Sequence, residues 1–400
     1  MLNASERVNH PLPTRELERR WALIRAAMAE RGIDVLLAQA NNDFMGGYVK
    51  YLTDLPATNG YSLTVVFPRD EPMTVIGQGA FGLDQRLPPE GDGVRRGVGR
   101  LMGVPSYASA YYSAGYDADL AAAALEGYRG ATIGMLGKAA ISFALIDGLK
   151  RGALSNAEFR DASDLVDPIK AVKSEDELAF VRRTAAAQDA AMEAAFAAIK
   201  PGMRDLEVAA IAEHVGHDLG SEQGLFLTHS SPAGSPGQIV NRHLQGRVLR
   251  QGDQFSLLVE NNGPGGFYCE LGRTAVLGRA TDEMQEQQAF VLEAQRFCLG
   301  LLKPGADPAQ IWNEYNRFMR ENGRSEEKRV HFHGQGYDMV ERPLIRFDET
   351  MPIDKNMYFA LHPAFTTERT YSWACDNFLL DSQGAVERLH QLPQRIFELG

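Results

Sequence analysis

The sequence predicts an α/β protein of two domains, and three observations lead to this prediction. Helical and strand-like patterns alternate through the first half of the chain, and a length of 400 residues suits two domains. In the second half, a long helix, a Lys-Pro-Gly stop and a second helix occur twice, with the stops at 200–202 and 303–305. Strand-like segments follow each copy, so we expect the second domain to arise by internal duplication.

The first domain is expected to span residues 1–168. An amphipathic helix is predicted over 15–32, because Leu17, Trp21 and Met28 recur at helical spacing and Gly32 can end the helix. The other elements expected here follow in chain order: a buried strand at 33–38, a hairpin of strands at 61–67 and 73–76, a helix near 117–125, and a strand and a helix within 131–149. This half carries no dense cluster of catalytic residue types.

The second domain is expected to span residues 169–400. Ser174 and Glu177 form the pattern of a capping box, so a long helix should begin there and run to Ile199. Asp205 is expected to cap the next helix. In the second copy, a helix should run from 282 to 302, and Asp307 should begin the helix after it.

Composition limits the partners of this chain. The formal net charge of -11 argues against nucleic acids and anionic membranes, which recruit basic surfaces. No apolar run approaches the roughly 20 residues that span a bilayer. The polar stretch 1–13 predicts no secretory signal. Three cysteines cannot form a disulfide framework, so we expect a cytoplasmic protein.

Five segments of the second domain hold charged or ligand-type residues in a regular order. They are 169–174 with the helix that follows, the hairpin 252–274, and the stretches 333–343, 357–363 and 373–389. In order and spacing they resemble the pita-bread hydrolases, the superfamily of methionine aminopeptidase, prolidase, aminopeptidase P and creatinase. The resemblance covers the second domain most specifically, and the first domain is similar to the smaller domain of creatinase and prolidase. It implies a pita-bread catalytic domain after a creatinase/prolidase-like α/β domain.

The resemblance also implies a metal site, from which this sequence departs. The metallopeptidases of the superfamily hold two metal ions with two Asp, one His and two Glu. Carried over by position, these ligands fall on Glu260, Glu270, His333, His362 and Cys375. Imidazole and thiolate cannot bridge two ions as bidentate carboxylates do. We therefore expect no conventional two-metal site.

Two alternatives remain open from the residues. In one, Glu270, His333, His362 and Cys375 hold a single zinc or iron ion, since each is a metal-ligand type. In the other, no metal is bound, and His243 shuttles protons as a histidine does in creatinase. Under either alternative, the expected catalytic residues are His243, His333 and Glu270, and the expected substrate-binding residues are Glu260, Glu341 and Arg342.

Each candidate also has a purely structural interpretation. Cys375 suits a small buried hydrophobe, His362 a core histidine, and Glu270 an ion pair with Arg273. By default, His229 and His331 are placed in loops or on the surface. Glu341, Arg342 and Arg346 more often form a solvated charge cluster than a substrate clamp.

The function expected from the resemblance is hydrolysis of a C–N bond in a small polar nitrogen-containing substrate. The alternatives are an Xaa-Pro dipeptidase or aminopeptidase-like metallopeptidase, a lyase on the same scaffold, and an inactive binding protein. By resemblance we also expect a homodimer, in which segments 41–51 and 107–112 reach the active site of the partner subunit.

Overall fold

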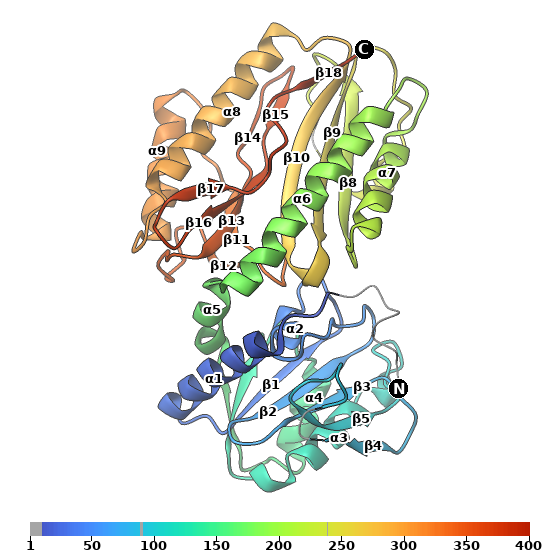
Figure 1. The fold of residues 1–400 in the computed structure, drawn as a ribbon, viewed down its shortest axis with the longest axis vertical. Coiled ribbons are helices and arrows are strands. Elements are labelled where there is room, and N and C mark those ends of the chain that lie inside the picture. Colours follow the sequence, from blue (N-terminus) through green and yellow to red (C-terminus); the bar gives the residue numbers. More distant parts are fainter. Residues whose placement is uncertain (1–9, 89–90, 238) are drawn as a thin grey trace. The chain divides into compact units, whose positions relative to one another are not determined.

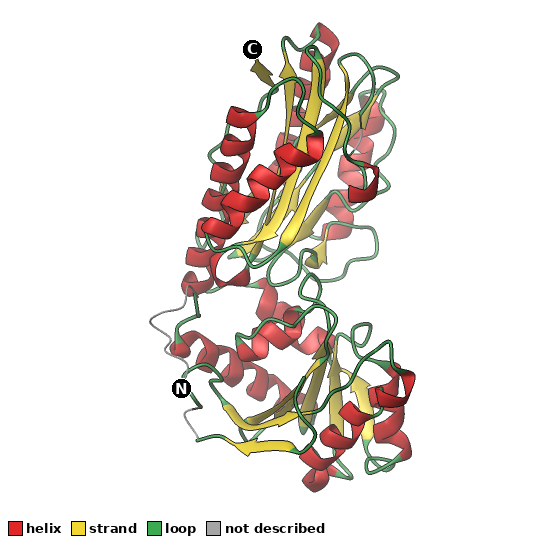
Figure 2. Ribbon diagram, turned by 90° about the vertical axis from the view of Figure 1, so that its right-hand side faces the viewer, coloured by secondary structure: helices red, strands yellow, loops and turns green. Residues whose placement is uncertain are grey.

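The structure is a computed structural model that describes residues 10–88, 91–237 and 239–400. Residues 1–9, on which the expectation of no secretory signal partly rests, lie outside the described residues. The chain divides into two compact units, Pro11–Lys170 and Ala171–Gly400, and His10 groups with the second. The boundary expected after residue 168 falls inside helix α5 (Ser163–Ala171). Both units contain helices and strands (Figure 2), so the α/β class is confirmed.

The first unit is a mixed sheet with helices packed against it (Figure 1). Within the described residues its strand order is β4-β5-β3-β2-β1-β6-β7. The predicted helix and hairpin are both present, and Gly32 ends the first helix in the left-handed conformation. The elements are α1 (Thr14–Arg31), β1 (Val35–Ala40), α2 (Gly47–Thr53), β2 (Leu63–Pro68), β3 (Met73–Gly77), β4 (Leu83–Arg86), β5 (Val98–Gly103), α3 (Tyr116–Ala124), β6 (Thr132–Leu136), α4 (Phe143–Arg151) and β7 (Glu158–Asp161).

The second unit contains the expected duplication. The first repeat consists of α6 (Glu175–Ala198), α7 (Asp205–Asp218), β8 (Gly224–Pro232), β9 (Asp253–Asn262) and β10 (Tyr268–Leu277). The second consists of α8 (Asp282–Leu301), α9 (Pro308–Glu321), β11 (Phe332–Gly334), β12 (Glu341–Leu344), β13 (Met357–Leu361), β14 (Ala364–Thr366), β15 (Tyr371–Trp373), β16 (Asp376–Leu380) and β17 (Val386–Arg388). Strand β18 (Phe397–Leu399) returns to the first repeat and pairs with β10. Each repeat is thus two helices followed by antiparallel strands (Figure 1).

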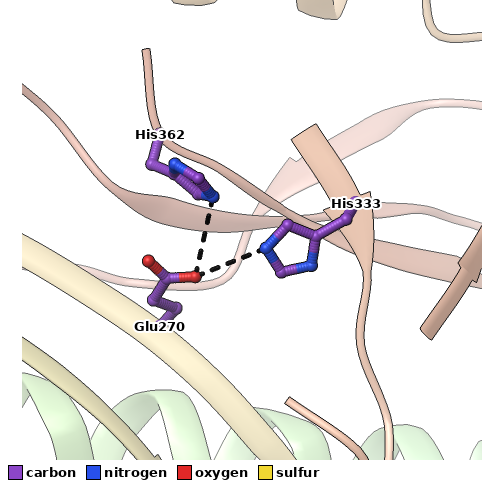
Figure 3. Close-up of side chains that lie close together, drawn as sticks. All are labelled: Glu270, His333 and His362. Atoms are coloured by element: carbon purple, nitrogen blue, oxygen red, sulfur yellow. Dashed lines mark ion pairs between the residues drawn. The ribbon is translucent and has the colours of Figure 1, made fainter. Parts of the chain in front are cut away.

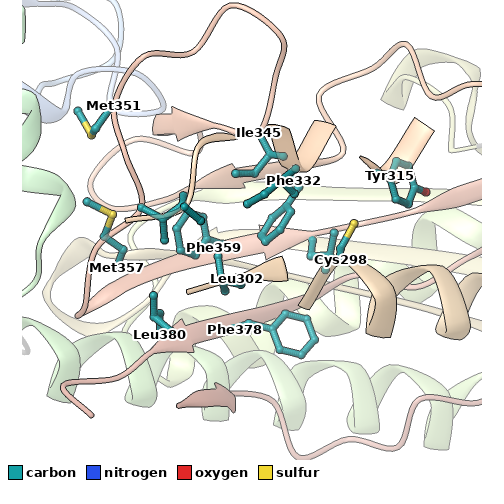
Figure 4. Close-up of a cluster of buried hydrophobic side chains, with 14 of the residues drawn as sticks. Cys298, Leu302, Tyr315, Phe332, Ile345, Met351, Met357, Phe359, Phe378 and Leu380 are labelled. Atoms are coloured by element: carbon teal, nitrogen blue, oxygen red, sulfur yellow. The ribbon is translucent and has the colours of Figure 1, made fainter. Parts of the chain in front are cut away.

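Each repeat has its own apolar core. Side chains of α6 and α7 pack on the sheet β18-β10-β9-β8 around Phe196, Val208 and Leu257. In the second repeat, the buried side chains of α8 and α9 lie against the sheet β12-β11-β13-β16-β17, with Phe332, Phe359 and Phe378 among them (Figure 4). Burial of these apolar faces is the main force that holds helices on sheets.

The helix ends follow the local sequence signals with one exception. The Ser174 hydroxyl accepts from the Glu177 amide and the Glu177 carboxylate accepts from the Ser174 amide, so the predicted capping box forms. The Asp307 carboxylate likewise accepts from the Ala309 amide. Asp205 was expected as a cap, but it is the first residue of α7 and its carboxylate accepts from Gly246 and Ser230 instead.

Backbone hydrogen bonds join the two repeats: the Tyr268 amide donates to the Gly336 carbonyl at 2.8 Å, and a bridge forms further along β10. Gly272 of β10 and Cys375, just before β16, form an isolated antiparallel bridge. A Cβ at Gly272 would lie 2.1 Å from the Trp373 ring, so only glycine permits this close approach. Beside the bridge, the Arg273 guanidinium pairs with the buried Asp376 carboxylate at 2.7 Å. The seam between the repeats is therefore held by the backbone and by a buried ion pair.

No helix among the described residues has the length and apolar character needed to cross a bilayer.

Candidate metal centre

Three ligand-type side chains meet where the two repeats join. Glu270 comes from β10 of the first repeat, while His333 on β11 and His362, directly after β13, come from the second. Their ligand atoms all lie within 4.8 Å of one another. The Glu270 Oε2 atom is 3.6 Å from His333 Nε2 and 4.0 Å from His362 Nε2 (Figure 3). Glu270 and His333 are buried, and His362 is partly exposed.

Hydrogen bonds of the surrounding backbone orient these side chains. The His333 Nδ1 atom is 3.0 Å from the Gly334 carbonyl oxygen. A carbonyl oxygen only accepts, so Nδ1 carries the hydrogen, and in the neutral ring Nε2 presents its lone pair to Glu270. The Glu270 amide donates to Asn377 Oδ1 at 2.6 Å, which fixes the strand at this residue. The orientation is the one in which an imidazole binds a metal.

A second carboxyl group lies beside Glu270. Glu260 is its direct partner across the antiparallel pair β9 and β10, so both side chains lie on one face of the sheet. Burial and the neighbouring charge of Glu270 raise the pKa of Glu260 well above its ordinary value. Two buried carboxylates side by side repel each other, which favours protonation of one member of this pair.

The ionised member of the pair is Glu270. Burial opposes its ionisation, but the nearby His362 and His333 lower the pKa of Glu270 to about 2. Burial lowers the pKa of His362 to about 4, although the charge of Glu270 acts in the opposite direction. The site therefore presents one buried carboxylate and uncharged imidazole, which is an arrangement that a cation would satisfy.

The donor set fits one divalent ion. Nitrogen and oxygen atoms bound at about 2.0–2.1 Å in a tetrahedron lie about 3.3 Å from one another, close to the 3.6 and 4.0 Å separations found here. Two histidines and one glutamate also leave one position open for water or substrate. The donor set does not fit two ions, because His362 replaces a carboxylate and imidazole cannot bridge.

Cys375, the fourth ligand expected from the sequence, lies outside the group formed by the other three. Its thiol donates to the Glu270 carbonyl oxygen at 3.3 Å. Burial and the charge of Glu270 raise the pKa of this thiol well above its ordinary value, which keeps it protonated. The structure thus brings together three of the four predicted ligands, and Cys375 packs beside them as a buried thiol.

The other predicted site residues have different surroundings. His243 is exposed on the 3-10 helix η4 (Arg242–Leu244), and within the described residues no hydrogen bond or ion pair links it to Glu270. Glu341 is buried and pairs with Lys173 at 3.3 Å, which excludes the solvated cluster expected for it. The Arg342 guanidinium pairs with Glu349. His243 is thus exposed, and Glu341 and Arg342 are engaged in ion pairs, whereas Glu260 lies at the site beside Glu270.

Three further expectations are corrected by the structure. Arg273 does not pair with Glu270, because its guanidinium binds Asp376 of the second repeat. His331 is fully buried instead of lying in a surface loop, and its ring stacks on Tyr315 with centroids 4.1 Å apart. His229 lies half-buried in β8. None of these neighbours is close in sequence, so no local pattern could have indicated them.

Sequence reasoning missed the polar residues behind the site. Asn377 is fully buried, and its amide also donates to Gln335 at 2.7 Å. The His390 Nε2 atom lies 3.3 Å from Asn377 Oδ1, and the Asp189 carboxylate lies 3.5 Å from the His390 Nδ1 atom. Asn377 stands in one of the five segments on which the resemblance rests. Its side-chain amide follows Asp376 and precedes an apolar run, and this was the available sequence signal for a buried polar residue.

Comparison with known proteins agrees with this architecture. Residues 179–387 match the sequence profile of metallopeptidase family M24, which covers more than half of the chain. The Xaa-Pro dipeptidase of Pyrococcus furiosus is 24% identical over 64% of this chain and 73% of its own length. The Xaa-Pro dipeptidase of Pyrococcus horikoshii is also 24% identical, over 66% of this chain and 74% of its own length.

Solved structures show the same fold over nearly the whole chain. An X-Pro aminopeptidase of Thermotoga maritima superposes with a TM-score of 0.77 at 20% identity, covering 96% of this chain and 99% of that one. The dipeptidase PepE of Mycobacterium ulcerans gives a TM-score of 0.74 at 21% identity, with 97% and 99% covered.

These findings confirm the resemblance to the pita-bread superfamily and the expectation of a hydrolase acting on a C–N bond. They favour the hypothesis of an Xaa-Pro peptidase over that of a hydrolase acting on a small nitrogen-containing compound. This chain belongs to metallopeptidase family M24.

Proposed function

We propose that the protein hydrolyses the C–N bond before proline in short peptides, with one divalent metal ion held by Glu270, His333 and His362. The observation that carries this proposal is the convergence of these three donors within 4.8 Å. The Xaa-Pro peptidases among its relatives support the substrate class. Two histidines and a glutamate are a common ligand set of catalytic zinc, so zinc is the ion that we propose.

The residues of the chain take the following roles. Glu270 supplies the one negative charge of the site, and His333 is oriented by its bond to the Gly334 carbonyl. A bound zinc ion would polarise the scissile carbonyl and ease ionisation of a water molecule. Glu260 lies across the strand pair from Glu270, and we assign it to hold the proton that the leaving nitrogen needs.

Metal content and product release test this proposal together. Protein purified without added metal should hold one ion per chain by elemental analysis, and it should release proline from leucyl-proline. Two ions per chain, with turnover stimulated by Mn²⁺ or Co²⁺, would contradict the one-metal site. One bound ion without proline release would contradict the substrate class.

Creatine serves as the comparison substrate in the same assay, because the metal-free alternative requires an enzyme that acts on small guanidino compounds. The exposed position of His243 disfavours that alternative. We expect no urea release from creatine.

We also propose that the protein is a homodimer and works in the cytoplasm. The segment expected to reach the partner carries exposed aromatic rings, with Tyr111 89% and Tyr112 70% exposed, and Phe81 and Phe143 are also largely exposed. The Tyr111 and Tyr112 rings are neighbours, and contiguous exposed apolar groups mark interaction surfaces. The three cysteines are free and buried, which suits a reducing compartment. Sedimentation at micromolar concentration tests the dimer, and a monomer there would contradict it.

A further inference from the structure

The backbone of Glu270 is held differently from that of its neighbours on β10. On either side of it, the amides of Tyr268 and Gly272 donate to backbone carbonyls of the second repeat, at 2.8 and 3.1 Å. The Glu270 amide, between them, donates to the side-chain oxygen of Asn377 at 2.6 Å. A buried amide needs a partner, so at the metal ligand a side chain takes the place of the backbone acceptor.

The Asn377 amide is fixed in one orientation by a second amide. It is fully buried on β16, and its Nδ2 atom donates to Gln335 Oε1 at 2.7 Å. Gln335 is also fully buried, and its Nε2 atom donates to the Met339 carbonyl at 2.9 Å. Because a carbonyl only accepts, this bond decides which end of the Gln335 amide faces Asn377. It thereby decides that the oxygen of Asn377 faces Glu270.

His390 contacts the same oxygen of Asn377. The His390 ring is fully buried, with its Nε2 atom 3.3 Å from Asn377 Oδ1 and its Nδ1 atom 3.5 Å from the carboxylate of Asp189 on α6. This carboxylate is itself fixed, because it accepts from two backbone amides directly after His390. The ring therefore stands between an anchored carboxylate of the first repeat and the Asn377 oxygen.

Asn377 contacts the segments that carry all three ligands. Its side chain bonds to Glu270 and to Gln335, which follows His333 by two residues. Its backbone pairs, in the register of β13 and β16, with the residue two positions before His362. Metal–ligand distances in a working site lie within about 0.2 Å of their ideal values, so a small displacement of one ligand weakens binding.

We propose that Asn377 is the positioning residue of the metal centre. Its amide sets the place of the Glu270 carboxylate beside the two histidines, and His390 holds that amide in its orientation. Asn377 acts through Glu270, because its oxygen faces the Glu270 amide and its nitrogen faces Gln335. The inference rests on the metal site of the proposed function and adds the residues that tune its affinity for the ion.

Zinc affinity of the full chain, measured by competition with a metal-binding dye, tests this role. Asn377→Leu has a similar shape without the amide, so zinc affinity should fall roughly 10–100-fold. Asn377→Asp keeps an oxygen for the Glu270 amide and should recover most of that loss. His390→Leu removes only the outer contact and should lose less than Asn377→Leu. Unchanged affinity in Asn377→Leu, or a loss as large in Asn377→Asp, overturns the proposal.

A second buried asparagine separates positioning from folding. Asn316 of α9 is buried, its Oδ1 atom accepts from the Glu327 amide at 2.7 Å, and its Nδ2 atom donates to the Glu327 carbonyl at 3.3 Å. Asn316→Leu removes contacts of the same kind away from the ligands. It should lower the temperature of unfolding, as Asn377→Leu does, and leave zinc affinity unchanged. An equal loss of zinc affinity in both variants would assign the effect to packing and overturn the proposal.

Hydrogen exchange over β10, followed by mass spectrometry, decides the same question in the metal-free protein. The Glu270 amide should exchange at least roughly tenfold faster in Asn377→Leu than in the unaltered chain, because it has lost its acceptor. In Asn377→Asp it should stay protected. Unchanged exchange in Asn377→Leu overturns the proposal.

The outcomes keep the positioning role and the proposed function apart. If the zinc affinities follow the expected order but leucyl-proline is not cleaved, the role of Asn377 stands and the proposed reaction fails. If the unaltered chain binds no zinc, the proposed function fails, and hydrogen exchange alone decides whether Asn377 holds Glu270 in place.

Discussion

The two repeats of the second unit share one architecture but supply opposite chemistry to the site between them. The first repeat contributes the carboxyl groups of Glu260 and Glu270, which lie side by side on paired strands. The second contributes the imidazoles of His333 and His362. A site with carboxylates on both sides carries enough negative charge for two divalent ions, whereas this one carries a single charge. Duplication therefore fixes where ligands stand, and the side chains at those positions decide how many ions they hold.

The largest effect is expected from removing the one charge of the site. Glu270→Gln keeps the shape of the side chain but leaves the histidines without an anionic partner, so metal affinity should fall roughly 100-fold or more. Proline release should fall with it. Competition with a metal-binding dye measures the affinity. Glu260→Gln is the matched control from the same repeat, and an equal loss of metal in both variants would mean that the two carboxylates act as joint ligands.

A large loss of stability is expected where the repeats are joined by the ion pair between Arg273 and Asp376. Arg273→Met removes the buried cation beside the fully buried Asp376 carboxylate, which should lower the free energy of unfolding by about 3 kcal/mol. Arg388 also contacts Asp376, at 3.3 Å, but is partly exposed, so Arg388→Met should cost about 1 kcal/mol or less. Urea denaturation measures both. Equal losses of unfolding free energy in the Arg273→Met and Arg388→Met variants would show that burial of the ion pair contributes little to the stability of the seam.

A smaller, pH-dependent effect is expected from Asp189 of α6, which contacts the end of the second repeat. Burial opposes its ionisation, but His390 and the amides of Gln391 and Leu392 lower the pKa of Asp189 below its ordinary value. A lowered pKa stabilises the folded state above about pH 4, and this stability disappears as the pH falls through the folded pKa. Asp189→Asn should therefore lose about 1 kcal/mol at pH 7, and the difference should shrink below pH 4.

Thermal unfolding at a series of pH values measures the effect of Asp189→Asn. The exposed Asp218, paired with His214 on the surface, provides the control Asp218→Asn with no measurable change. If the stability difference between Asp189→Asn and the unaltered chain grows as the pH falls, the pKa of Asp189 is raised and not lowered in the folded state.

The smallest effect is expected from Cys375. Because its sulfur lies outside the ligand group, Cys375→Ala should leave metal affinity within about twofold and cost about 1 kcal/mol of stability through the small cavity created. A tenfold loss of metal affinity in this variant would restore Cys375 as a fourth ligand and give the second repeat a charged donor of its own.

The parts of the fold that depend on local signals were predictable from the sequence. The Ser174 capping box, the Gly32 helix end and the repeated helix pairs all formed where the pattern placed them. Glu270, His333 and His362 were also placed together, because the resemblance assigns each of them to a ligand position.

The parts that depend on distant contacts were not predictable. Arg273 pairs with Asp376, although Glu270 is nearer to it in sequence. His331 is buried against Tyr315 of α9. His243 lies on a segment that the sequence shows to be about two residues shorter than in the resembling family, and the structure leaves it exposed. Such outcomes are decided by packing between elements, which single-sequence patterns do not contain.

The bridge between Gly272 and Cys375 has a consequence for how the unit could be assembled. Each repeat keeps its own core, while the bridge, the Arg273–Asp376 pair and the ligands are shared between them. The short connection 278–281 between β10 and α8 could thus be cut without removing any of these contacts. The two fragments would then be expected to reassociate like subunits of a heterodimer. Neither fragment has a complete metal site, so recovered metal binding would report their reassembly.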